Sequence, residues 1–351
     1  MCEGANTLAH AECLLEARDP VRAVVLFDRA EAEGHNPDRC AAGRWTAAML
    51  SGDFSAAWHE SDAIRLRGSP DPNRLWEGED FCNKRIILRC LHGLGDAVQF
   101  LRYAPLLRAR AERLIVECAP CATELVRCLP GIDEVVTWGP KSPITPSVWD
   151  IQIEIMELPY LFRSTLTSLP IMGSYLHLPE ADLQHASDLL AYRCGPRIGI
   201  VWSAGEWNPS RSIPLYLLAP TLTRHDVGFW NLQGGLVRQQ WSNLPCSPNL
   251  HDLCILADAG VVPLAAVIAQ LDLVITVDTL AAHIAGALNI PCLLLLQYAA
   301  DWRWMMDRDD SPWYPSLRLL RQPEPNDWPR VVRNLDRVLD QWLANWKQAS
   351  R

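Results

Sequence analysis

Long hydrophobic runs are missing from this chain, and their absence argues against an integral membrane protein. No apolar stretch in the 351 residues approaches the roughly 20 residues that a membrane-spanning helix needs. The first residues include Glu3 and Glu12 in place of the basic and apolar stretch of a secretory signal. We therefore expect a cytoplasmic protein with no transmembrane segment, and peripheral association with the inner membrane face stays open.

Positive charge is also scarce. The chain has 32 Lys and Arg against 41 Asp and Glu, a net charge of −9. Nucleic-acid phosphates would be repelled overall, so we predict no nucleic-acid partner. Cys118 and Cys121 have C-x-x-C spacing, but no second pair completes a zinc site. The sequence thus predicts no bound metal, and the twelve scattered cysteines are expected to be reduced thiols.

Several catalytic motifs are incomplete. The glycines at 93 and 95 are too few for a dinucleotide-binding fingerprint. Ser203 follows a predicted strand, but Val201 stands where a nucleophile elbow needs glycine. Asp307 and Asp309 have D-x-D spacing, yet they lie in a highly charged stretch that is typical of a solvated turn. These patterns disfavour a dinucleotide enzyme, an esterase and a metal-dependent transferase.

Residues 1–75 are predicted to be helical, with an internal repeat. Similar positions recur 34 residues apart, which is the period of a tetratricopeptide repeat (TPR): Asp19 and Asp53, Ala23 and Ala57, Phe27 and Ser61. Fewer than three repeats rarely stand alone, so this TPR-like segment should pack on the remainder of the chain. An unspecialised helical cap fits nearly as well.

The rest of the chain alternates strands and helices, which predicts an α/β fold. Strands are expected at 86–90, 114–118, 135–138 and 151–155, then at 197–202, 227–233, 271–277 and 292–296. Helices are expected at 96–110, 121–128, 180–193 and 327–346, and the proline-rich stretch 140–146 is expected to be a surface loop. We predict two Rossmann-like domains facing a cleft, at 84–178 and 196–325, and a C-terminal helix within 326–351.

The stretch around residue 278 is the strongest candidate for a ligand site. The apolar run 271–277 reads as a buried strand, and Asp278 and Thr279 are natural helix caps. A helix that begins at the end of such a strand offers free N–H groups and a positive dipole to a phosphate. His283 lies one turn further on and could reach the same anion. The alternative is that Asp278 or Thr279 only caps the helix and that His283 is structural.

Five motifs, in order, resemble bacterial TPR glycosyltransferases related to the heptosyltransferase family (glycosyltransferase family 9). They lie at 93–105 (GLGDAVQFLRYAP), 211–214 (RSIP), 232–233 (LQ), 277–286 (VDT…AHIAG) and 301–315 (DWRW…DSPWYP). The resemblance covers the chain from about residue 85 to its end. It implies a GT-B fold and inverting transfer without a metal or another cofactor, with a nucleotide-sugar as substrate.

The resemblance also implies roles for individual residues. It places the catalytic base at Asp96, although an aspartate here is more commonly a helix cap. It places the donor diphosphate beside Arg211, a position where the heptosyltransferases usually have lysine, and beside Ser212, Asp278, Thr279 and His283. Gln233 would reach the nucleotide base or ribose, or would simply be a turn residue. Further cleft residues are Gly93, Gly95, Gln99, Trp202, Asp301 and Trp302.

Together these features predict an enzyme. It would transfer a hexose or heptose, with ADP-heptose as one candidate donor, to a hydroxyl of a glycan, lipid or protein, and the TPR-like segment would bind a protein partner. The alternative is a catalytically silent module that recruits a partner or holds a nucleotide or glycan. The presence of both Asp96 and the set around Asp278 favours the enzyme.

Overall fold

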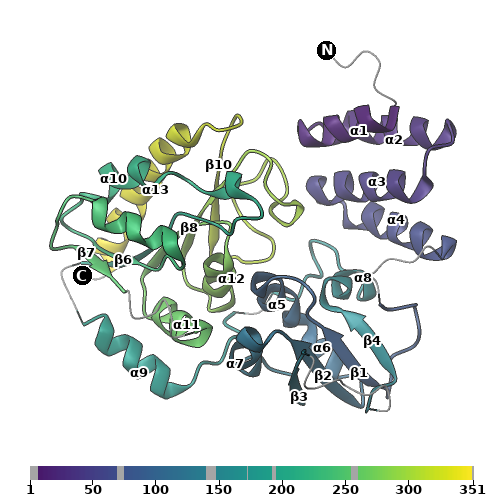
Figure 1. Cartoon of the computed structure of the whole chain (residues 1–351), viewed down its shortest axis with the longest axis horizontal. Coiled ribbons are helices and arrows are strands. Elements are labelled where there is room, and N and C mark those ends of the chain that lie inside the picture. The colour runs from purple at the N-terminus through teal and green to yellow at the C-terminus, as the bar shows by residue number, and fades with distance from the viewer. Residues whose placement is uncertain are drawn as a thin grey trace.

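Three parts make up the protein, which we describe from a computed structural model. The structure describes residues 7–68, 75–139, 148–171, 173–191, 195–253 and 260–349. The predicted loop at 140–146 and the end of the helix expected at 180–193 lie outside these residues. A stack of helices, coloured purple to blue in Figure 1, sits beside two α/β parts.

The first part, which we call the helical segment, consists of α1 (Thr7–Glu16), α2 (Pro20–Ala32), α3 (Pro37–Ser51) and α4 (Phe54–Arg67). The 34-residue spacing has a structural counterpart: Asp19 and Asp53 are the N-caps of α2 and α4, and each carboxylate accepts a hydrogen bond from the amide three residues on. Ala23 and Ala57 are both fully buried. The repeating unit is a helix pair, and its assignment as a TPR stays a prediction.

The N-terminal sheet is entirely parallel. It contains β1 (Arg85–Arg89), β2 (Arg113–Cys118), β3 (Glu134–Thr137) and β4 (Ile151–Glu154), in the order β3-β2-β1-β4. Its helices are α5 (Leu94–Phe100), α6 (Ala104–Arg108), α7 (Thr123–Arg127) and α8 (Leu158–Leu161). The helix expected at 96–110 is divided into α5, a 3-10 turn and α6, because Pro105 has no N–H to continue the hydrogen-bond ladder.

The C-terminal sheet is also parallel. It contains β5 (Arg197–Val201), β6 (Gly228–Asn231), β7 (Leu250–Asp252), β8 (Leu273–Val277), β9 (Cys292–Leu296) and β10 (Leu317–Arg321). Its helices are α9 (Glu180–Leu189), α10 (Leu215–Leu222), α11 (Val261–Ala269), α12 (Leu280–Ala287) and α13 (Trp328–Ala349). The order β10-β9-β8-β5-β6-β7 is that of a Rossmann sheet, in which the strand order reverses between β5 and β8. Ligands are expected outside the carboxyl ends of these strands.

Hydrophobic packing joins the three parts. One buried cluster includes Phe54 of α4, Phe100 of α5 and Leu294 of β9. A second cluster lies between the C-terminal sheet and α10 and α13, with Ile198 and Leu335 among its members. In Figure 1, α5 and α12 lie side by side where the two sheets approach each other. Among the described helices, none is long and apolar enough to cross a membrane.

Candidate functional site

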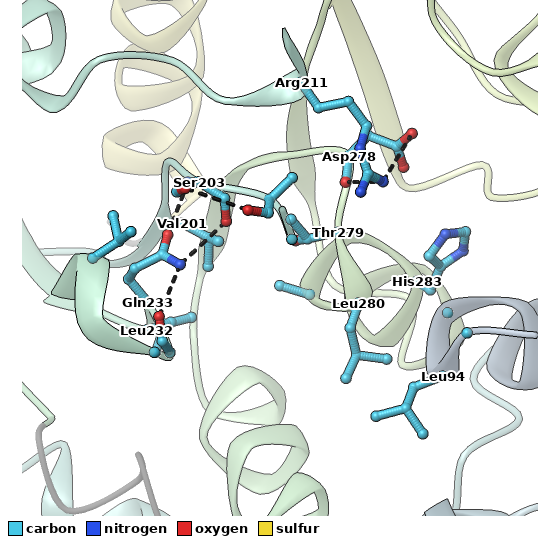
Figure 2. A pocket seen from close by; sticks show the side chains of 18 of the residues that line it. Leu94, Val201, Ser203, Arg211, Leu232, Gln233, Asp278, Thr279, Leu280 and His283 are labelled. Carbon is cyan, nitrogen blue, oxygen red and sulfur yellow. Dashed lines mark hydrogen bonds and ion pairs between the residues drawn. The ribbon is translucent and has the colours of Figure 1, made fainter. Parts of the chain in front are cut away.

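A pocket of about 590 Å³ opens at the switch point of the C-terminal sheet. Its walls include the segments that follow β5, β6 and β8, together with the start of α5 from the N-terminal part. Figure 2 shows Arg211 and Asp278 on one side, Gln233 and Ser203 on another, and Leu94 of α5 beside Leu280 and His283. The pocket therefore lies between the two α/β parts.

The start of α12 forms one wall. Thr279 is the N-cap of α12, but its side chain makes no capping hydrogen bond; Thr279 Oγ1 lies 3.0 Å from Thr276 Oγ1 instead. Leu280 and Ala281 also line the pocket. The first amides of a helix have no partner within it, so this wall presents N–H groups and the positive end of the helix dipole.

Arg211 reaches this wall from the segment after β5. Its Nη1 donates to the backbone oxygen of Asp278 at 3.0 Å and lies 4.0 Å from Asp278 Oδ2. Its guanidinium stacks on the exposed ring of Trp207 at 4.2 Å. Burial, assisted by Asp301, raises the pKa of the Asp278 carboxyl, while Arg303 and Arg211 oppose the rise. Asp278 thus holds Arg211 in place at the pocket wall.

His283 is buried and uncharged at neutral pH. Burial is the main reason that its pKa lies well below the usual value, and Arg303, Arg102 and Arg211 lower it further. His283 Nδ1 lies 3.0 Å from the Tyr314 hydroxyl. The ring also lines the pocket, so His283 offers hydrogen bonding there and no charge.

Gly95 allows α5 to approach this histidine closely. A Cβ atom at position 95 would lie 2.6 Å from His283 Cδ2, well inside van der Waals contact. Gly93 and Gly95 both line the pocket. The glycine of the motif at position 95 thus serves the packing of the two α/β parts against each other.

Asp96 occupies the third position of α5, because the helix begins at Leu94 with Gly93 as its N-cap. The prediction that the helix starts at residue 96 was therefore wrong by two residues. Asp96 Oδ2 accepts a hydrogen bond from the Gly93 N–H at 3.0 Å, and Asp96 Oδ1 accepts one from Arg303 Nη2 at 2.7 Å. The side chain supports the helix start and also lines the pocket.

Arg303 also lines the pocket, and the sequence did not single it out. It lies in the 3-10 helix Trp302–Trp304, and its Nη1 is 3.2 Å from Asp301 Oδ1. Burial alone would lower the pKa of its guanidinium, but Asp301, Asp96 and Asp278 together raise it. The sequence signal for Arg303 was its place within the DWRW motif. Its partner Asp96 is 207 positions away, so their pairing was not visible in the sequence.

The side chains of Ser212 and Gln233 are hydrogen-bonded to backbone groups of neighbouring segments. Ser212 Oγ accepts a hydrogen bond from Ala204 N at 3.0 Å and does not line the pocket. Gln233 lines it, but its Oε1 accepts from the amides of Trp202 and Ser203, and its Nε2 donates to the carbonyls of Ser203 and Gly234. The Gln233 side chain therefore ties the end of β6 to the end of β5.

Four further predicted cleft residues do not line this pocket. Gln99 is fully buried within α5. Trp202 is buried and stacks on Trp241. Asp301 accepts a hydrogen bond from the amide of Arg303, and Trp302 packs on neighbouring aromatic rings. Their polarity or aromatic character was visible in the sequence, but the direction in which each side chain points was not.

Comparison with known proteins gives matches in sequence and in fold. No family model matches the chain. Protein FlbA of Caulobacter vibrioides is 25% identical over 324 residues, which are 81% of this chain and 50% of FlbA. The chain therefore spans about half the length of this curated relative.

Among solved structures, E. coli ADP-heptose LPS heptosyltransferase II superposes with a TM-score of 0.53 at 15% identity, over 73% of this chain and 99% of that one. A glycosyltransferase family 9 protein of Veillonella parvula gives a TM-score of 0.49 at 14% identity, over 70% and 87% of the two chains. The match to the E. coli enzyme confirms the expected GT-B-like fold, and with it the predicted resemblance at the level of fold.

Proposed function

We propose that this chain is an inverting glycosyltransferase that moves a sugar from a nucleotide donor to an acceptor hydroxyl without a metal ion. One observation carries the proposal. A carboxylate from the N-terminal part, Asp96, and the helix start with Arg211 from the C-terminal part line the same pocket. A general base on one side and a site for an anionic leaving group on the other are what such a transfer requires.

In the proposed reaction the acceptor hydroxyl oxygen attacks the anomeric carbon of the donor sugar. The bond from that carbon to the phosphate oxygen breaks, and its electron pair leaves with the nucleotide. Asp96 takes the hydroxyl proton. The α12 amides and Arg211 stabilise the negative charge on the leaving group, and the neutral His283 adds a hydrogen bond.

The donor is proposed to lie across the switch point. The phosphates would meet Thr279 and the start of α12, and the base would lie toward Gly234 and Leu236 at the end of β6, which also line the pocket. The acceptor is a hydroxyl of a glycan, lipid or protein, and the helical segment is proposed to bind a protein acceptor or partner. Heptose from ADP-heptose is one candidate donor, because the E. coli structure with the same fold is an ADP-heptose heptosyltransferase.

A donor screen tests the proposal. The melting temperature would be measured with ADP, UDP, GDP and dTDP, and a nucleotide present at 100 times its Kd should stabilise the protein by roughly 2.7 kcal/mol. Transfer from the sugar-linked form of the best nucleotide, including ADP-heptose, would then be assayed with and without EDTA. We expect transfer that survives EDTA.

Asp96→Asn is the matched control for that assay. The amide keeps an acceptor oxygen but cannot take a proton, so transfer should fall by about 10²- to 10⁴-fold while nucleotide affinity is kept. Transfer at the parent rate would remove Asp96 as the base, and activity that EDTA abolishes and Mn²⁺ restores would remove the metal-free mechanism. Nucleotide binding without any transfer would favour the silent binding module.

A further inference from the structure

Aromatic contacts lead from the helical segment to the arginine that pairs with Asp96. The ring centroids of Trp45, on α3, and Trp302 are 5.3 Å apart in an edge-to-face arrangement. Trp302 also stacks on Phe100 at 6.3 Å. The Arg303 guanidinium lies over the Trp302 ring at 5.3 Å and over the Phe100 ring at 5.8 Å. The rings of Trp45, Trp302 and Phe100, which we call the aromatic shelf, thus support Arg303, and α3 contributes Trp45 to this shelf.

The backbone that carries Arg303 is also fixed by α3. The amide of Met306 donates to the carbonyl of Leu50 at 2.9 Å, which joins this backbone to the carboxyl end of α3. Met305 has a φ of 51°, a value that residues other than glycine rarely adopt. Arg321 Nη2 donates to the Met305 carbonyl at 2.6 Å and holds this conformation. Surrounding contacts, and not local preference, therefore shape the segment.

The resulting geometry is suited to orient a carboxylate. Arg303 is buried, and its Nη1 and Nη2 are each occupied by an aspartate oxygen, from Asp301 and Asp96. A planar guanidinium that packs against two aromatic rings and pairs with two carboxylates has little freedom to rotate, so the direction from which it binds Asp96 is set in advance. A misplacement of about 1 Å at a reacting group can cost on the order of 100-fold in rate.

We propose that Trp45 and Arg303 are positioning residues: Trp45 fixes Trp302, Trp302 and Phe100 fix Arg303, and Arg303 holds the Asp96 carboxylate in the orientation needed for catalysis. The catalytic part of this proposal rests on the proposed function. The helical segment then has a role in the reaction itself, separate from any partner that it binds. Its docking on the C-terminal part completes the site around a residue of the N-terminal part.

The first experiment needs no substrate. Asp96→Asn, Arg303→Met and the double variant would be unfolded in urea, in the parent and again in a Trp45→Ala background. We expect the two changes to be coupled in the parent, so that their combined effect on the unfolding equilibrium constant departs from the product of the single effects by about tenfold. In the Trp45→Ala background this departure should nearly disappear, so that the coupling factor between the two changes is close to one.

The second experiment uses a donor that the parent turns over. Trp45→Ala should lower kcat by about tenfold or more with an unchanged nucleotide Kd, and Trp45→Phe should restore most of the rate. In an Arg303→Met background, Trp45→Ala should have little further effect. Asp62→Ala is the matched control, because Asp62 joins α4 to Tyr160 and Arg163, away from the aromatic shelf; it should leave kcat unchanged.

The outcomes separate the two proposals. Coupling between Asp96 and Arg303 that is equal with and without Trp45 overturns the inference, whatever the enzyme does. An equal loss of kcat in Asp62→Ala and Trp45→Ala also overturns it, because docking of the helical segment would then be its whole contribution. If the coupling between Asp96 and Arg303 depends on Trp45 but the protein transfers no sugar, the link from Trp45 to Asp96 is supported. The glycosyltransferase proposal is then removed.

Discussion

Charge balance decides what each residue around the pocket can do. Arg211 and Arg303 face Asp96, Asp278 and Asp301, and most of these side chains are largely buried. Removing one member of a buried ion pair leaves an uncompensated charge, which commonly costs about 3–5 kcal/mol. The effect of each charge-removing variant at this site on stability must therefore be measured beside its effect on binding or transfer.

Arg211 is expected to dominate nucleotide affinity. Arg211→Ala removes a charge and up to two hydrogen bonds to phosphate, which should weaken binding by about 10- to 100-fold. The nucleotide affinity of Arg211→Lys should lie between those of Arg211→Ala and the parent, because lysine keeps the charge without the planar fork. His283→Ala should cost less, since the ring is neutral. Calorimetric titration measures all three, and unchanged affinity in every variant would return both residues to a structural role.

Glu154 should make the fold more stable at acid than at neutral pH. Its side chain is fully buried at the end of β4, 3.7 Å from His92 Nε2. Burial raises its pKa from 4.5 to about 8, Glu157 and Asp96 contribute, and a hydrogen bond from the Met156 amide opposes the rise. The folded state keeps a proton that the unfolded chain releases, so this stability is complete below about pH 4.5 and is lost as the pH rises through about 8.

Glu154→Gln tests this reasoning because glutamine stays neutral at every pH. The stability of the parent relative to the variant should fall between pH 5 and 8, by at most about 1.4 kcal/mol per pH unit. Urea unfolding across that range gives the difference directly. Parallel stability curves for the two proteins would show that Glu154 is ionised in the folded state.

At the scale of elements, local patterns were readable from the sequence and long-range ones were not. The strand β8 and the start of α12 follow from a continuous apolar run and from Asp278 and Thr279, residue types that favour a helix start, although only Thr279 occupies the N-cap position. β7 has only three residues, none of them buried, and it was missed. β10, which was also missed, is an edge strand whose sequence, LRLLR, contains no β-branched or aromatic residue. Asp278, Thr279 and His283 were found because they are neighbours, whereas Arg303 meets Asp96 only after the chain has folded.

The contact between α5 and α12 depends on the glycine at position 95. In Gly95→Ala the new Cβ would lie 2.6 Å from His283 Cδ2 and 3.1 Å from its Nε2. Relief of that clash must move one helix or the histidine, so we expect a destabilisation of about 1–3 kcal/mol and weaker nucleotide binding. Thermal unfolding and titration give both values.

Two further variants identify the cause of that effect. In Gly95→Ala/His283→Ala the clash is gone, and stability should recover relative to Gly95→Ala. Gly93→Ala is the neighbouring control, since its Cβ would meet only Asp96 Oδ2 at 3.3 Å and should disturb the interface less. A double variant less stable than either single one would contradict the close approach.

At the scale of the whole molecule, the shared core predicts that α3 and α4 of the helical segment unfold together with the pocket. Phe54 is buried, and its ring lies 6.0 Å from that of Trp313 within the cluster that also contains Leu294. Phe27 is equally buried but belongs to a separate cluster within the first helices. The two phenylalanines therefore have the same chemistry and burial but different connections.

Phe54→Ala should lower the stability of the entire protein, by about 3–5 kcal/mol, because it opens a cavity in the core that joins the three parts. Fluorescence and circular dichroism should still report a single transition, and nucleotide binding should weaken with it. Phe27→Ala should instead loosen α1 and α2 locally, which hydrogen exchange would detect, and should leave nucleotide affinity near that of the parent. If the pocket kept its full stability in Phe54→Ala, α4 and the pocket would not share one cooperative core. If Phe27→Ala weakened binding as much as Phe54→Ala, the coupling to the pocket would not depend on the cluster that contains Phe54.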